Sequence, residues 1–448
     1  MLTTFKNYKL QYKSLVALGI PIIIGQLGNI VTGLADTIMV GQHSTDELAA
    51  ASFVNNVVNA FIVLGTGFSF SLIPLIGENL AKKRLGEIGG WLKNSIVANI
   101  TTALLIMLVL AAIYFNLDLL DQPDEIMPLI KPYYLVTFVS VIFVMIANSF
   151  RQFVEGIGNP SVSMWILLSG NMLNIIGNYI LIYGKFGVPE LGLFGAGVST
   201  LASRIIMLLL FVAVFMRRRA YEPYRRGMST MKINMQGWKK LNAIGWPIGV
   251  QQGLEAGTFC MTAIMIGWLG SMQLAAHQVA ITVSTISYTT YLGLGSAVAI
   301  RASYFNGMND WRMVRSITMA GVHIALMLVV VVCTTLFLMK DFLGLIFTDD
   351  VAVNDIVKTI IPILMLYQIG DSVQIVVSNA LRGLADVKII MWISFFAYFI
   401  IAVPAGYLCG FPLGMGISGV WLAYPVGFAC SVTMLGIRMK NLVRSHLA

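Results

Sequence analysis

Three acidic side chains lie in stretches of this sequence that are otherwise apolar enough to cross a membrane. Glu255 lies near the middle of the stretch 246–270, Asp371 lies deep in a later stretch, and Asp36 lies in an early one. An ionised side chain at the centre of a transmembrane helix costs at least about 2.5 to 3.5 kcal/mol, so such residues usually face an internal cavity and serve ions, protons or substrates. These acids therefore indicate ion or substrate binding within a membrane.

In the second half of the chain, both acids have polar neighbours at helical spacing. Gln251 precedes Glu255 by four residues and Tyr367 precedes Asp371 by four, so each pair shares one helical face. Two carboxylates buried close together cannot both stay ionised without a cation between them, which would permit exchange of Na+ or H+ for a cationic compound. The alternative is a pair of structural acids that are hydrogen-bonded separately.

In the first half, amide side chains accompany the acid. Asn174 and Asn178 share a helical face with Asn171. Amide oxygens together with the Asp36 carboxylate would form a set of hard oxygen ligands for a small cation or a transferable proton. Two alternatives stay open, since amide-rich faces also join transmembrane helices and Asp36 could be an interfacial acid at a helix end. Arg204 could be a counter-ion for an acid or could extend towards a membrane surface, and a structural role is favoured.

A proline lies in the same early stretch as Asp36. Pro21 precedes Asp36 by about four helical turns. It removes one backbone hydrogen bond, which predicts a hinge in the first helix.

The composition is that of a membrane protein. Of the 448 residues, 58% are hydrophobic and 11% are charged, whereas soluble domains carry about 25% charged residues. The net charge of +9 does not indicate a nucleic-acid partner, because the basic residues lie in short loops between apolar stretches. The four cysteines have no metal-ligand spacing and there is no Walker A motif, so neither a zinc site nor ATP as an energy source is supported.

A window of about 19 residues identifies twelve apolar segments, each close to the length of about 20 residues that crosses a bilayer. They cover approximately residues 15–40, 48–74, 94–115, 129–150, 161–183, 193–216, 241–266, 277–300, 316–339, 357–381, 389–410 and 416–437. Most Lys and Arg residues, Arg382 among them, then fall in alternate connections, which places both termini in the cytoplasm. The sequence predicts an all-α polytopic membrane protein.

The two halves of the chain repeat one another. Residues 17–21 match residues 243–247 at an offset of 226. Because each half has six helices, the two copies should have the same orientation and be related by an axis along the membrane normal. We expect two pseudo-symmetric six-helix lobes, an N-lobe of residues 1–225 and a C-lobe of residues 226–448. A central cavity between them would open to alternate sides, as in secondary transporters.

These motifs resemble the multidrug and toxic compound extrusion (MATE) family, specifically its NorM-like bacterial branch, over essentially the whole chain. The resemblance is carried by PIIIGQLGNIVTGLADTIMVG, EGIGNPSVSMWILLSGNMLNIIGNYILIYG, LGLFGAGVST, WPIGVQQGLEAGTFC and LYQIGDSVQ. It implies antiport in the bacterial inner membrane, in which a cation drives export of amphipathic, often cationic compounds through inward-open and outward-open states.

The resemblance also implies two cation sites. They are, in the N-lobe, Asp36, Asn174, Asn178 and Thr200, and, in the C-lobe, Glu255, Tyr367 and Asp371. The expected coupling ion is Na+ or H+, and Na+ is favoured because amide, hydroxyl and carbonyl oxygens accompany the acids. The expected partners are small-molecule drugs, cations and membrane lipid, without a covalently bound cofactor or nucleic acid, and the expected state is a monomer.

Two other functions remain as alternatives. A flippase for a lipid-linked saccharide on a related scaffold would need a basic cavity for the pyrophosphate, whereas the charges deep within the apolar segments are mainly acidic: Asp36, Glu255 and Asp371 against Arg204. A polytopic membrane enzyme would need a nucleophile or metal constellation, and the sequence shows none. The sequence therefore predicts a multidrug efflux antiporter and not an enzyme.

Overall fold

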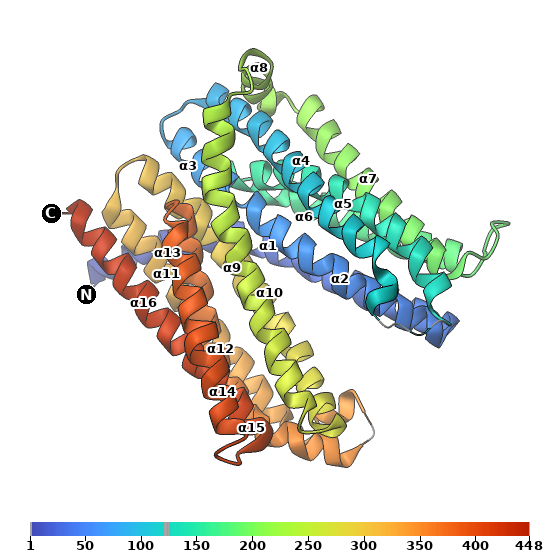
Figure 1. Cartoon of the computed structure of the whole chain (residues 1–448). Coiled ribbons are helices and arrows are strands. Elements are labelled where there is room, and N and C mark those ends of the chain that lie inside the picture. Colours follow the sequence, from blue (N-terminus) through green and yellow to red (C-terminus); the bar gives the residue numbers. More distant parts are fainter. Residues whose placement is uncertain (1, 121–122, 124, 349, 448) are drawn as a thin grey trace. The chain divides into compact units, whose positions relative to one another are not determined.

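The computed structural model describes residues 2–120, 123, 125–348 and 350–447, and this part of the chain is almost entirely helical (Figure 1). The elements of the first half are α1 (Leu2–His43), α2 (Thr45–Ser69), α3 (Leu72–Ala81), α4 (Leu85–Phe115), η1 (Leu117–Leu120), α5 (Met127–Gly156), α6 (Pro160–Ile182), α7 (Gly192–Arg217), η2 (Arg219–Tyr221) and α8 (Glu222–Thr230). Those of the second half are α9 (Met235–Gly267), α10 (Ser271–Gly307), α11 (Trp311–Met339), η3 (Gly344–Ile346), α12 (Val351–Gly383), α13 (Val387–Phe395), the π-helical η4 (Phe396–Ala402), α14 (Val403–Gly410), α15 (Gly416–Trp421) and α16 (Ala423–Leu447).

Every one of the twelve predicted segments coincides with helical structure, so the all-α prediction is confirmed. Within the described residues, ten helical segments are long and apolar enough to cross a membrane. The other two predicted segments are α9 and α10, which have 33 and 37 residues. They are long enough but more polar, because α9 contains Gln251, Gln252 and Glu255 and α10 is rich in Ser and Thr.

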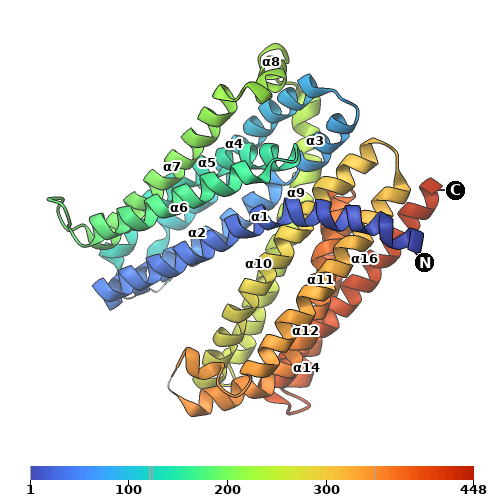
Figure 2. The same cartoon turned by 180° about the vertical axis from the view of Figure 1, so that it is seen from behind.

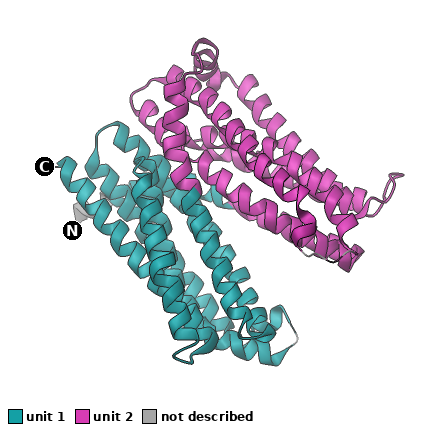
Figure 3. Cartoon of the chain, viewed as in Figure 1, with its two compact units in different colours: residues 1–23, 250–448 teal, residues 24–249 magenta. Residues whose placement is uncertain are grey.

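The chain forms two compact units, which Figure 3 colours separately. Unit 1 consists of residues 1–23 and 250–448, and unit 2 consists of residues 24–249. The chain passes from one unit to the other inside α1, after Ile23, and inside α9, after Gly249. These two positions are separated by 226 residues, the offset of the predicted repeat, and each follows a proline by two residues.

The compact units divide the chain differently from the predicted lobes. The lobe boundary between residues 225 and 226 falls within α8, and α8 packs on α4 inside unit 2. A Cβ atom on Gly89 of α4 would lie 1.9 Å from the carbonyl oxygen of Tyr224, and one on Gly227 would lie 2.0 Å from the carbonyl oxygen of Gly86. The connection between the halves is therefore a closely packed helix. The two lobes are the two copies of the sequence repeat, whereas the two units are the groups of helices that pack against one another.

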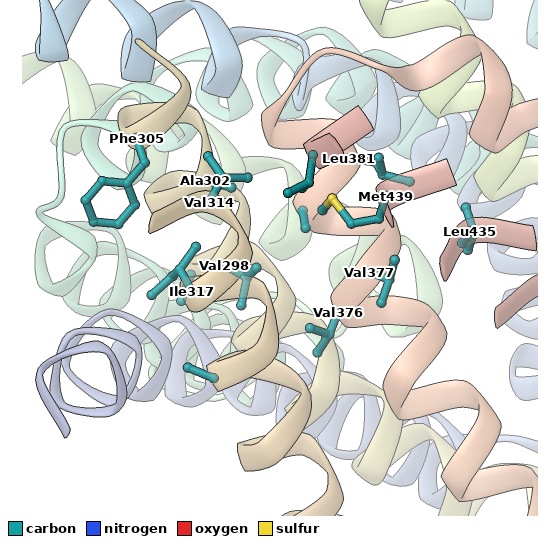
Figure 4. Close-up of a cluster of buried hydrophobic side chains, with 14 of the residues drawn as sticks. Val298, Ala302, Phe305, Val314, Ile317, Val376, Val377, Leu381, Leu435 and Met439 are labelled. Atoms are coloured by element: carbon teal, nitrogen blue, oxygen red, sulfur yellow. The ribbon is translucent and has the colours of Figure 1, made fainter. Parts of the chain in front are cut away.

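Each unit has its own apolar core. In unit 1, α10, α11 and α12 pack together (Figure 2), and Val298, Ile317, Val376 and Leu381 belong to one buried cluster (Figure 4). In unit 2, a separate cluster of buried side chains joins α2, α4 and α5. The first core includes side chains of α12, and the second also includes Val40 of α1, Ile182 of α6 and Leu193 of α7, so these cores hold helices that carry candidate site residues.

Candidate functional site

In unit 2, the predicted N-lobe residues come together from three helices. The amide nitrogen of Asn178 on α6 donates a hydrogen bond to the carboxylate Oδ1 of Asp36 on α1, with 2.5 Å between the two atoms. The amide nitrogen of Asn174 donates to the hydroxyl of Thr200 on α7 at 3.2 Å. Asn174 and Asn178 lie one turn apart on α6, so the four side chains form one polar cluster.

Glycines allow this close approach of the helices. A Cβ atom on Gly28 of α1 would lie 2.9 Å from Leu168 Cδ2 and 3.1 Å from the amide nitrogen of Asn171, both on α6. A Cβ atom on Gly177 of α6 would lie 2.4 Å from the hydroxyl oxygen of Ser199 on α7. Larger side chains would force these neighbours to move, so the glycines help to set the distances between the candidate ligands.

Two carbonyl oxygens of the cluster are buried and, among the described residues, have no hydrogen-bond partner. They are the Oδ1 atoms of Asn174 and Asn178, whose residues are 3% and 0% exposed. A buried acceptor without a partner is destabilising. Together with the Asp36 carboxylate, these oxygens form a set of ligands that suits a small hard cation. Of these three side chains, Asp36 alone can take up a proton.

Arg204 of α7 belongs to the same region. Its guanidinium donates to the hydroxyl of Ser140 on α5, and it interacts electrostatically with Asp36 and Tyr133. The arginine thus joins α5 to α7, a structural role, and also lies within electrostatic range of the acid, as the counter-ion alternative supposes.

In unit 1, Glu255 on α9 accepts two hydrogen bonds. The amide nitrogen of Gln374 on α12 and the hydroxyl of Tyr398 on η4 donate to the same carboxylate oxygen, at 3.0 and 3.1 Å. Sequence reasoning missed both donors. Gln374 lies three residues after Asp371, so helical periodicity could have identified it. Tyr398 lies in a π-helical segment, a feature often found at functional sites that periodicity does not reveal.

Asp371 and Tyr367 lie on α12, one turn apart, and both are buried. Asp371 is 3% exposed and Tyr367 is 2% exposed. Within the described part of the chain, Oδ2 of Asp371 has no hydrogen-bond partner, and the residue interacts electrostatically with Glu255. The ring of Tyr367 packs against Tyr424 and Phe428, with ring centroids 5.6 and 5.2 Å apart. The structure thus brings the two acids into one neighbourhood beside an aromatic cluster.

Gln251 binds an arginine that the sequence placed in a cytoplasmic connection. Arg382 lies in the last turn of α12 and is 5% exposed, and the prediction that this end of the helix faces the cytoplasm stays a prediction. Its guanidinium donates to the side-chain oxygen of Gln251 and, at 3.3 Å, to that of Asn379. It also interacts electrostatically with Glu255. The helix extends past the predicted segment end at residue 381, so its last turn carries the arginine into the polar cluster.

The atoms that could coordinate a cation at the two clusters are mainly oxygen atoms. In the part of the chain that the structure describes, no group of three or more His, Cys, Asp or Glu side chains could hold a metal ion. Each cluster instead combines carboxylate with amide or hydroxyl groups. Such sets can bind an alkali-metal cation or exchange a proton, and they lack the soft donors that transition metals prefer. Pro21 lies inside α1, outside both clusters, and its role as a hinge stays a prediction.

Comparison with known proteins agrees with the repeat and the fold. The MatE family model matches residues 21–180 and again residues 247–408, so the second match begins 226 residues after the first. The multidrug resistance protein MdtK of Edwardsiella ictaluri is 31% identical over 455 residues, which span 98% of this chain and 97% of that protein.

Solved structures share the fold. A mutant of the Vibrio cholerae MATE transporter VcmN has a TM-score of 0.89 at 17% identity, covering 98% of each chain. The eukaryotic MATE transporter AtDTX14 has a TM-score of 0.86 at 18% identity, covering 98% of this chain and 99% of that one. The chain therefore belongs to the MatE family, whose members are membrane transporters and not enzymes.

Proposed function

We propose that this chain is a multidrug efflux antiporter of a bacterial cytoplasmic membrane, in which Na+ or H+ drives the export of amphipathic, often cationic compounds. The observation that carries the proposal is the pair of acids in unit 1, the half-buried Glu255 and the buried Asp371, which lie within electrostatic range of each other on two helices of a membrane protein. The name of its relative, a multidrug resistance protein, supports the class of substrate.

Competition for these carboxylates would couple the two fluxes. Two like charges repel strongly in an interior of low dielectric constant, so the pair is stabilised by a bound Na+, a proton or a cationic drug. Binding of one cation therefore opposes binding of the other. A ligand moves the balance between inward-open and outward-open states only if its affinities for the two states differ.

A one-for-one exchange of Na+ or H+ for a monovalent cationic drug moves no net charge, so the concentration gradient of the coupling ion drives it. The membrane potential contributes when more positive charge enters than leaves: each net charge that moves inward releases about 2.3 kcal/mol per 100 mV, which sustains a substrate gradient of more than about tenfold. We favour Na+ as the coupling ion, because carbonyl and hydroxyl oxygens accompany the acids in both clusters.

Substitution of the two acids tests the proposal in cells. Asp371→Asn and Glu255→Gln keep the shape of each side chain and remove its charge, so we expect both to abolish efflux of ethidium while expression stays intact. Asp355→Asn is a matched control, since Asp355 lies on the same helix as Asp371 but is exposed and pairs with Lys358 at 3.2 Å. Normal resistance in both acid variants would overturn the proposal.

The orientation in the membrane and the oligomeric state are also part of the proposal. We propose that both termini lie in the cytoplasm and that the protein acts as a monomer in the lipid bilayer. A reporter that is active only in the cytoplasm, fused after the C-terminus, tests the orientation. The flippase alternative is not favoured, because the three ionisable side chains near one another in unit 1 are the two acids Glu255 and Asp371 and a single arginine, Arg382, which would line a pyrophosphate site poorly.

A further inference from the structure

In unit 2, a histidine at the end of α1 lies between two carboxylates. His43 is the last residue of α1. Its ring nitrogen Nδ1 lies 2.7 Å from the carboxylate of Glu47 on α2. The other ring nitrogen, Nε2, lies 2.8 Å from the carboxylate of Glu190, in the connection between α6 and α7. We call these three side chains the His43 cluster, and in it both ring nitrogens face an acceptor.

This geometry requires two N–H donors on the ring of His43. A neutral imidazole has one N–H and one bare nitrogen, whereas an imidazolium has two N–H groups. A bare nitrogen this close to a carboxylate oxygen would turn two lone pairs towards each other, so the arrangement fits an imidazolium between two carboxylates. The side chain of Glu190 is 65% exposed, against 19% for that of His43. Water therefore reaches the cluster from the side of Glu190, and the proton of His43 can exchange with it.

Few other titratable groups surround the histidine. Those near it on the elements packed around it are Asp46 on α2, Tyr179 and Tyr183 at the end of α6, and Lys185 in the connection after α6. Among the described residues, none of these four forms an ion pair with His43, and Tyr183 alone makes a ring contact with it, with 6.1 Å between the centroids. The first three turns of α7 contain no titratable side chain. The charge state of His43 therefore depends mainly on the two carboxylates that contact it.

Two glycines hold the carboxylates in place around the ring. Gly192, the first residue of α7, has a φ angle of +52°, and a Cβ atom there would meet Oε1 of Glu47 and lie 3.1 Å from Cε1 of His43. Gly184 has a φ angle of +61°, and a Cβ atom there would lie 2.8 Å from the backbone nitrogen of Glu190. Both positions require glycine. The connection between α6 and α7 is thus packed closely enough to fix the two acceptors.

The His43 cluster joins α1 to the same two helices as the polar cluster around Asp36. Asp36 accepts a hydrogen bond from Asn178 on α6, and α7 supplies Thr200 to that cluster. His43 follows Asp36 by seven residues, which is about two turns on nearly the same face of α1. Its contact with Glu190 lies between α6 and α7. The ion pair therefore holds the end of the helical segment that carries Asp36.

One further contact attaches this end of α1 to α6. The hydroxyl of Tyr183 donates to the backbone carbonyl oxygen of Met39 at 2.9 Å. Met39 lies between Asp36 and His43 on α1. With the ion pair in place, two attachments fix both the position and the direction of the helix end. Without it, the Tyr183 bond alone lets the helix end turn.

We propose that His43 is a positioning residue for Asp36: as an imidazolium between Glu47 and Glu190 it holds the end of α1, and loss of its proton releases that end. The attachment is stabilised at pH values at which the ring is protonated. It weakens as the pH rises, because a neutral ring keeps one N–H and turns a lone pair towards a carboxylate. The inference goes beyond the proposed function, since His43 binds neither the coupling cation nor the drug.

Hydrogen exchange of backbone amides in purified full-length protein tests the inference across pH. The measured segments are residues 33–37, around Asp36, and residues 38–43, and exchange times are corrected for the intrinsic rate at each pH. For the wild type, we expect the protection of both segments to fall by at least about tenfold as His43 loses its proton, since a hydrogen bond to a charged group is lost. His446→Gln is the control, because it removes an exposed histidine of unit 1 and should leave the profile unchanged.

Two substitutions separate the charge of His43 from its presence. His43→Arg keeps a permanent cation with several N–H donors, so we expect high protection at every pH. His43→Gln is neutral at every pH, so we expect low protection throughout. Glu190→Gln removes the exposed acceptor and should lower protection at low pH to the level of His43→Gln. This third variant decides the question if the substitutions at position 43 do not fold.

The outcomes that overturn the inference are distinct from those that overturn the proposed function. Equal profiles for the wild type and His43→Gln, equal profiles for His43→Arg and His43→Gln, or a wild-type profile in Glu190→Gln would exclude a role for the proton. A change confined to residues 38–43 would exclude a role in positioning Asp36. Amide exchange does not require transport, so the proposed function stands in each case. If ethidium uptake ignores both Na+ and pH gradients, the proposed function fails whatever the exchange profile.

Discussion

At the scale of single residues, two hydrogen-bond donors from distant parts of the chain hold the carboxylate of Glu255. It accepts from Gln374 and Tyr398, which are separated from it by 119 and 143 residues in the sequence. The acids and asparagines could be predicted from the sequence because polar side chains in apolar helices are costly and therefore stand out. The residues that hydrogen-bond to them could not be predicted, because contacts between residues far apart in the sequence depend on how the helices pack and leave no local sequence pattern.

Substitution of Tyr398 by Phe removes one hydrogen bond to Glu255 without changing the ring. A hydrogen bond to a charged group contributes about 1.5 to 3 kcal/mol. We therefore expect the half-saturating concentration of the coupling cation to change by at least about tenfold. The control is Tyr407→Phe, since Tyr407 is 47% exposed on α14. Equal effects of the two substitutions would contradict a specific role for Tyr398.

At the scale of elements, the membrane explains why helices could be predicted. Backbone groups in hydrocarbon must be hydrogen-bonded within the segment, so apolar stretches of sufficient length form helices. The more polar helices α9 and α10 could still be recognised, because residues 241–266 and 277–300 are apolar enough over a window of about 19 residues. The π-helical turn of η4 and the last turn of α12, which buries Arg382, could not be predicted because both depend on packing in unit 1.

The packing of α8 on α4 permits a stability test. A Cβ atom on Gly89 would lie 1.9 Å from the backbone carbonyl oxygen of Tyr224, and backbone cannot move aside as a side chain can. We expect Gly89→Ala to destabilise unit 2 by about 1 to 3 kcal/mol, the usual range for overpacking. Gly436→Ala in α16 is the matched control, because a Cβ atom there meets no atom within 4 Å. Thermal unfolding of the purified protein would show equal stabilities for the two variants if the close approach does not exist in solution.

The prolines of α1 and α9 permit a test of the hinge. Pro21 and Pro247 each lie two residues before a passage between the compact units. Pro21→Ala restores a backbone hydrogen bond. We expect it to slow ethidium transport in reconstituted vesicles while the number of coupling cations bound per molecule stays that of the wild type. A transport rate equal to that of the wild type would exclude a hinge at this proline.

At the scale of the whole molecule, the repeat is the feature that the sequence predicts best. An offset of 226 relates the two matches of the family model and also the two points at which the chain passes between units. The composition of the units could not be predicted, because α1 and α9 are continuous helices, and the prolines two residues before the passages predict a bend but not a change of packing partner. The central claim is that Glu255 and Asp371 of unit 1 exchange a coupling cation for a drug.

Ethidium uptake into proteoliposomes under separately imposed Na+ and pH gradients tests that claim most directly. We predict that one of the two gradients drives uptake into vesicles with wild-type protein, and that neither does so with Asp371→Asn or Glu255→Gln. Uptake at the same rate without any gradient, or gradient-driven uptake that persists in both acid variants, would contradict it.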